Sequence, residues 1–265
     1  MPRDPKDRQT DNSRSDKHIT RADARSLVDE SADMQRRVYA AGDRYRVCGE
    51  RELERKHGYA KAYVRGAQSK LESLGFRRAG DIQDVIVSGE MKWFAKPTIL
   101  RTFVNNEGTV AAAYVVKMRR LGWLASLFGL IPKIIRTIDL GTELTDGRFV
   151  MTGNTLGLNT MDPPPEIVRR QLDPTTPIDE LVSEHSKQLA KTLADAGPDV
   201  AVRPARTIDD VIAGAMREND IKRRHKQRRG YAPTANELRL ANDGKIDKLT
   251  SLAMEEADRR GQRGA

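Results

Sequence analysis

Two hairpin signatures in the middle of the chain constrain its fold more than any other feature. A strand-like run over 98–104 is followed by an Asn-Asn-Glu-Gly turn and by a second run over 109–117. The pattern recurs where the run 133–144 is followed by a Thr-Asp-Gly turn and the run 148–152. Glycine after Asn, Glu or Asp supplies the positive φ angles that tight hairpins need. The four runs therefore predict a small antiparallel sheet.

Helical patterns lie on both sides of this predicted sheet. Apolar residues at steps of three and four predict a helix over 59–74, which Gly75 is expected to end. A second helix is predicted over 177–196, with Thr176 as its N-cap and Pro177 at its first position.

The C-terminal third of the chain predicts further helices. Thr207, followed three residues later by an acidic residue, predicts the start of one helix, and Thr234 predicts the start of another. A last helix is predicted over 245–260. Before the hairpins, the Val-Ile-Val run over 85–87 is expected to form a short extra strand.

These elements together predict an α+β fold. We expect a four- to five-stranded antiparallel meander flanked by helices, with a cystatin-like or α+β-roll outline. The polar residues 1–20 are expected to be disordered, and 21–57 to form a charged helical arm. Residues 58–197 would form the α+β domain, and 198–265 a basic helical extension.

Short turn and strand-end sequences are scattered over residues 60–195. They are Leu74-Gly75-Phe76, Gly80-Asp81, Arg101-Thr102-Phe103, Glu107-Gly108, Asp146-Gly147 and Thr152-Gly153-Asn154. This set resembles uncharacterised bacterial proteins with a short helix-plus-meander domain. The resemblance implies that 60–195 is a unit with additions at both ends, and it implies no activity.

Composition and charge restrict the partners, the disulfides and the cellular location that we expect for the chain. The chain has 47 basic and 38 acidic residues, a net charge of +9, which favours a polyanionic partner or simple solubility. Cys48 is the single cysteine, so no intramolecular disulfide can form. No apolar run reaches the ~18 residues of a membrane span. The N-terminus lacks the apolar region of a signal peptide, so we expect a cytoplasmic location, with association at a membrane surface as an alternative.

Motifs that would identify an activity are missing from the sequence. It contains no phosphate-binding loop, no dinucleotide fingerprint, no nucleophile elbow and no zinc-protease motif. We therefore expect no metal and no cofactor, and we assign no catalytic residue.

An uncharged segment over 121–131 interrupts the link between the two hairpins. It suits a protein interface, insertion at a membrane surface, or a buried helix that covers the sheet. Its candidate partner-binding residues are Leu121, Trp123, Leu124, Leu127, Phe128 and Ile131.

A basic run over 222–229 follows the helix that begins after Thr207. Such a run can contact phosphates through charge alone, or it can be a solvated face near a helix C-terminus, where cations are favourable. Its candidate anion-binding residues are Lys222, Arg223, Arg224, Lys226, Arg228 and Arg229.

His185 lies on the apolar stripe of the helix over 177–196. It is either a hydrogen-bonded core histidine or part of a pocket between sheet and helix, with Arg101 or Tyr114 lining the same pocket. A catalytic role would need a carboxylate brought from elsewhere. The candidate carboxylates are Asp81, Asp139 and Glu143.

The sequence leads to one leading hypothesis and two alternatives. The leading hypothesis is a non-enzymatic binding or adaptor protein that presents 121–131 and 222–229 to a protein or an anionic partner. The first alternative is a nucleic-acid-associated protein that uses the basic helix. The second is an enzyme or small-ligand carrier with a pocket near His185.

Overall fold

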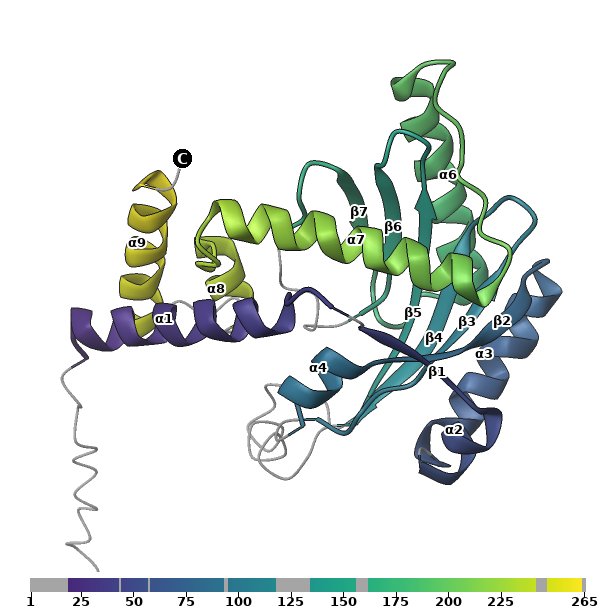
Figure 1. Cartoon of the computed structure of the whole chain (residues 1–265), viewed down its shortest axis with the longest axis horizontal. Coiled ribbons are helices and arrows are strands. Elements are labelled where there is room, and N and C mark those ends of the chain that lie inside the picture. The colour runs from purple at the N-terminus through teal and green to yellow at the C-terminus, as the bar shows by residue number, and fades with distance from the viewer. Residues whose placement is uncertain are drawn as a thin grey trace, which may run out of the picture.

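The chain forms an α+β fold around one seven-stranded sheet in the computed structural model (Figure 1). The structure describes residues 19–42, 44–56, 58–92, 95–117, 134–155, 162–241 and 247–263. The strands are β1 (Tyr45–Cys48), β2 (Arg77–Asp84), β3 (Leu100–Val104), β4 (Val110–Lys117), β5 (Ile134–Glu143), β6 (Phe149–Gly153) and β7 (Ile167–Gln171). The helices are α1 (Arg21–Val38), α2 (Glu50–Lys56), α3 (Lys61–Ser73), α4 (Val85–Glu90), α6 (Ile178–Ala196), α7 (Ile208–Arg228), α8 (Ala235–Ala241) and α9 (Lys248–Arg263), with a 3₁₀ turn over Gly58–Ala60.

The α+β class is confirmed, but the sheet is larger than predicted. The seven strands lie in sequence order, so the prediction of four to five strands is wrong. All neighbours pair antiparallel except β6 and β7, which run parallel, so the sheet is mixed. One strand missing from the prediction is β2. Its sequence begins with two arginines and ends with an aspartate, which obscures the alternation of apolar and polar residues that is typical of a strand. β1 and β7 are short edge strands of four and five residues.

The two predicted hairpins are confirmed as β3–β4 and β5–β6. Gly108 and Gly147 adopt φ angles of +86° and +88° in their turns, as the sequence pattern requires. In the first turn, Asn105 Oδ1 accepts hydrogen bonds from the backbone N–H groups of Glu107, at 3.1 Å, and Thr109, at 2.8 Å. The local sequence therefore fixes both turns.

One face of the sheet is closely packed against α3 and α6. Phe103, Leu140, Leu71 and Leu181 are all 0% exposed and belong to one cluster from the strands and both helices. Alanines of β4, including Ala113, fill the centre of this cluster and let the helices approach. This face supplies the main hydrophobic core.

The opposite face is crossed by α7 (Figure 1), which packs on the sheet at two places along its length. The helix begins at the predicted N-cap, Thr207, with a capping box. Near the start, Val211 packs with Ile82 and Val104. Further on, Ile221 packs with Phe149 and other residues of the sheet. The two places are ten residues apart along the helix, or roughly 15 Å.

The two ends of the described chain pack on each other beside the sheet (Figure 1). Ala24 and Val28 of α1 join Ala253 and Ala257 of α9 in a buried cluster. The expected helical arm over 21–57 also contains β1, which pairs with β2. The first helix of this predicted arm, α1, is the one that packs on the C-terminal helix α9.

Two local predictions were wrong. The run 85–87 begins helix α4 instead of forming a strand, because Asp84 caps the helix by accepting the backbone N–H of Val87 at 2.9 Å. The N-cap of α6 is Pro177, which offers no side-chain hydrogen bond, and not Thr176. In the first case the side-chain cap prevails over the β propensity of Val-Ile-Val.

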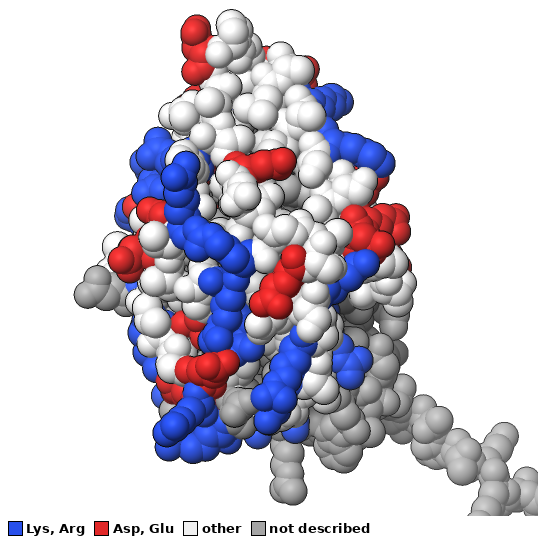
Figure 2. All heavy atoms as spheres, turned by 90° about the vertical axis from the view of Figure 1, so that its right-hand side faces the viewer, with Lys and Arg blue, Asp and Glu red and all other residues white. Residues whose placement is uncertain are grey.

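One face of the molecule carries both signs of charge (Figure 2). On the face drawn in Figure 2, Lys and Arg side chains alternate with Asp and Glu side chains, and no single basic field covers it. Among the helices that the structure describes, none combines the length and the apolar character needed to cross a bilayer.

Candidate ligand-binding cavity

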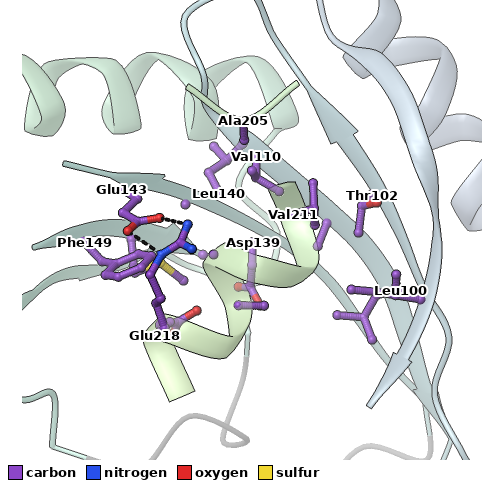
Figure 3. Close-up of a pocket in the computed structure, with 18 of the residues that line it drawn as sticks. Leu100, Thr102, Val110, Asp139, Leu140, Glu143, Phe149, Ala205, Val211 and Glu218 are labelled. Carbon is purple, nitrogen blue, oxygen red and sulfur yellow. Dashed lines mark hydrogen bonds and ion pairs between the residues drawn. The ribbon is translucent and has the colours of Figure 1, made fainter. Parts of the chain in front are cut away.

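A cavity of about 710 Å³ lies between the middle of α7 and the sheet. Figure 3 shows labelled residues from the sheet, such as Val110 and Asp139, and from α7, such as Val211 and Glu218, around this space. The apolar part of its wall is formed by Ile82, Val87, Leu100, Val110, Phe149, Met151 and Val211. A second hollow of about 500 Å³ adjoins it toward α1 and α8 and is also lined by Tyr114.

Small residues on the two opposing surfaces leave this space empty. The sheet contributes Ala112, Gly141 and Gly153, and the part of α7 above them contributes a run of Ala213, Gly214 and Ala215. Larger side chains at these positions would occupy part of the space between the sheet and α7. The cavity therefore follows from the sequence of β4, β5, β6 and α7.

Ion pairs line one side of the cavity. Arg217 of α7 donates to both carboxylate oxygens of Glu143, at 2.7 Å each, and these hydrogen bonds raise the pKa of Arg217 (Figure 3). Arg203 Nε lies 3.2 Å from Glu143 Oε1. On α7 itself, Lys222 pairs with Glu218. These carboxylates are therefore compensated by neighbouring cations.

Among the residues that the structure describes, Asp139 of β5 has no cation paired with its carboxylate. Its Oδ2 accepts a hydrogen bond from the Tyr114 hydroxyl at 2.6 Å, and its Oδ1 accepts one from the Thr155 hydroxyl at 3.2 Å. Burial raises the pKa of Asp139, and the two hydrogen bonds offset part of this rise. The carboxyl group can therefore accept hydrogen bonds or a proton from a molecule in the cavity.

Gly153 is what allows the Asp139 carboxylate to lie where it does. The two residues are directly paired across β5 and β6. A Cβ atom added to Gly153 would lie 2.1 Å from Asp139 Oδ1, well inside contact distance. Only glycine leaves room for the carboxylate at this point of the sheet.

The three residues predicted to line a pocket are divided between the two faces. Tyr114 lines the cavity. Arg101 lies on the closely packed face, where it donates to both oxygens of Asp81, at 2.9 and 3.0 Å. His185 also lies on that face and belongs to α6, whereas the cavity lies beneath α7. Neither Arg101 nor His185 is among the cavity-lining residues.

His185 is a hydrogen-bonded core residue. Its Nε2 lies 2.8 Å from Thr142 Oγ1 and its Nδ1 lies 3.1 Å from Thr152 Oγ1. Burial lowers the pKa of His185 to about 4, so the ring is neutral at physiological pH. The candidate carboxylates Asp139 and Glu143 point to the opposite face of the sheet.

The basic run at the end of α7 is partly neutralised by pairing within the protein. Lys226 is 1% exposed, and its ammonium group is within 2.6 Å of both oxygens of Glu237. Arg223 pairs with Asp220. Lys222 pairs with Glu218, as described above, and the exposed Arg228 lies 3.8 Å from Glu166. Arg224 is exposed and Arg229 is part-exposed. The number of cations free to meet an anionic partner is smaller than the sequence indicates.

The apolar segment over 121–131 lies outside the described residues. Its candidate contacts, including Trp123 and Phe128, therefore stay predictions.

Sequence reasoning considered Asp139 only as a candidate carboxylate for His185, on the other face of the sheet, and did not consider Thr155. The signal that could have found them is the alternation along the strands. In β5, positions 139, 141 and 143 share one face, and two of them are polar while Gly141 is small. Polar and small residues on a buried face are typical of a hollow.

No family model, no curated protein and no solved structure matches the chain. In the described part of the chain, no three His, Cys, Asp or Glu side chains come together as a metal site. The function must therefore be argued from the cavity itself.

Proposed function

We propose that the protein binds a small amphipathic molecule in the cavity beneath α7. The observation that carries the proposal is a hollow of about 710 Å³ with an apolar wall on one part and charged and polar side chains on another. Small-molecule sites typically have volumes of roughly 300–1,000 Å³ and combine apolar walls with polar groups that orient the ligand.

The hypothesis of an adaptor with two contact surfaces stays a prediction. Its apolar surface, 121–131, lies outside the described residues. Its basic surface rests mainly on Arg224 and Arg229, because Lys222, Arg223 and Lys226 are paired within the protein and Arg228 lies 3.8 Å from Glu166. The same pairing weakens the case for a nucleic-acid partner.

The proposal is tested with a panel of small ligands and a cavity-filling variant. The panel carries an amine, an alcohol or a carboxylate on the same set of apolar bodies: phenyl, indolyl, naphthyl and cyclohexyl. Binding is measured by ligand-observed NMR and by the rise in the thermal midpoint. We expect some members to bind the wild type, and Ala112→Leu, which places a larger side chain in the cavity, to abolish this binding.

A matched control makes the same chemical change on the surface. Ala190 is an exposed residue of α6, so Ala190→Leu should bind the panel as the wild type does. If no member of the panel binds, or if Ala112→Leu binds as tightly as the wild type, the cavity is not a binding site.

A further inference from the structure

Four carboxylates line the cavity, and their surroundings differ. Glu143 is held by two arginines, and Glu218 by Lys222. Asp210 belongs to the N-terminal turn of α7, where its carboxylate accepts backbone and side-chain hydrogen bonds from Thr207. Asp139 is held by two hydroxyl groups alone. Among the described residues, Asp139 thus has neither the ion pair of the two glutamates nor the backbone N–H donors that hold Asp210 at the start of α7.

Asp139 keeps hydrogen-bonding capacity toward the cavity. A carboxylate has about four lone-pair sites, and the hydroxyls of Tyr114 and Thr155 use two of them. Asp139 is part-exposed and lines the cavity. A ligand atom can therefore reach the free lone pairs.

Arg169 also lines the cavity, and its charge acts on Asp139. Its charge favours the ionised form of Asp139, but among the described residues it forms no ion pair with that carboxylate. The charge of Glu218 acts in the opposite direction. The two influences act at longer range than a direct contact, so the carboxylate still lacks a cation at its own oxygens.

We infer that the ligand of this cavity carries a protonated amine that donates hydrogen bonds to Asp139. A buried carboxylate without a cation is destabilised by desolvation. A bound ammonium group compensates this cost through its charge, whereas a neutral donor compensates only part of it. The apolar wall would cover the rest of the molecule. The inference rests on the proposed function, because it names the ligand class for the same site.

The competing ligand classes make different demands on the site. An alcohol can donate one hydrogen bond to Asp139 but brings no charge. A carboxylate would be repelled by Asp139, and would bind only if Arg169 dominated the cavity. The ranking of amine, alcohol and carboxylate on one apolar body therefore reports which group controls recognition.

The experiment measures affinities of the matched panel members by calorimetry for the wild type and for Asp139→Asn. For the wild type, we expect each binding amine to bind at least about tenfold more tightly than its alcohol and its carboxylate. Asp139→Asn keeps the side-chain volume and should weaken amine binding at least ~30-fold. It should change alcohol binding less than about threefold, so the alcohol serves as an internal control for folding.

Two further variants separate direct contact from general charge. Glu218→Gln removes the same charge from the same cavity, but that carboxylate is already paired with Lys222, so amine binding should fall less than about threefold. Gly153→Ala displaces the Asp139 carboxylate without removing its charge and should weaken amine binding about tenfold or more.

The outcomes distinguish this inference from the proposed function. If alcohols or carboxylates bind as tightly as amines, or if Asp139→Asn leaves the amine preference intact, the amine assignment is wrong and the cavity remains a binding site. If no panel member binds the wild type, both proposals fail together.

Discussion

On the face of the sheet that α3 and α6 cover, His185 lies between two threonine hydroxyls and has no access to a cavity. On the face beneath α7, Asp139 also accepts two hydroxyl groups, but it borders an open volume of about 710 Å³. Both groups are buried and polar. The first is enclosed by a packed core, whereas the second faces a space that the protein leaves unfilled.

The difference originates in residue size at alternating positions of the same strands. In β4, Ala113 faces the packed side and meets large side chains from the helices, whereas Ala112 faces the cavity. In β5, Leu140 faces the core and Gly141 faces the cavity. Substitutions at neighbouring residues of one strand therefore probe the packed face and the cavity face separately.

The largest expected effect compares two leucine truncations. Leu140→Ala should lower the free energy of unfolding by about 3–5 kcal/mol, because the residue is 0% exposed in the main core. Leu100→Ala should cost about 1–2 kcal/mol, because this side chain borders the cavity and is part-exposed. Urea denaturation of both variants measures the difference. Equal losses would mean that the face beneath α7 is as tightly packed as the other.

The second effect is a pH dependence from His185. Its pKa is about 4 in the folded protein and about 6.5 when unfolded, so the unfolded state binds the proton more readily. The neutral histidine therefore supports stability above pH ~6.5, and that stability is lost as pH falls toward 4, by about 3 kcal/mol in total. His185→Gln should remove this part of the pH dependence. An unchanged profile in the variant would show that His185 is not held neutral by the core.

The third effect compares two enlargements in adjacent positions. Ala113→Leu should destabilise the protein by about 1–3 kcal/mol, because the position is 0% exposed and leaves no room for added atoms. Ala112→Leu should cost less than ~1 kcal/mol, since its side chain enters the cavity. Chemical denaturation checks both values. A loss of stability in Ala112→Leu as large as that in Ala113→Leu would argue against the cavity.

The smallest effect compares two threonines. Thr142→Val removes a partner of the buried His185 Nε2 and should cost about 1–3 kcal/mol. Thr155→Val removes a partner of Asp139, where water from the cavity can take its place, and should cost less than ~1 kcal/mol. Thermal unfolding of the pair at neutral pH measures the contrast, and the reverse order would contradict it.

The hairpins and the longer helices could be predicted because local signals specify them. Gly108 and Gly147 mark the turns, and Thr207 with its acidic partner marks the start of α7. The edge strand β7 could not be predicted in the same way, because its parallel pairing with β6 depends on contacts distant in the sequence. Local pattern also failed at 85–87, where one capping carboxylate decided the structure.

The candidate site could be predicted only in part, since a cavity depends on which face each helix covers. Of the three predicted pocket residues, Tyr114 lines the cavity, and its alternation with Ala113 along β4 places it on the face beneath α7. His185 was grouped with it because the sequence does not show that α6 and α7 lie on opposite faces. The small residues that create the cavity come from three strands and one helix, and only the fold brings them together.

The most direct test of the central claim is a methyl-resolved NMR titration of the full chain with a panel member that binds. The account predicts shifts for methyl groups that line the cavity, those of Leu100, Val110 and Val211, and none for Leu71 and Leu181 in the packed core. Shifts confined to the packed core or to the outer surface, with the cavity methyl groups unchanged at saturation, would contradict it.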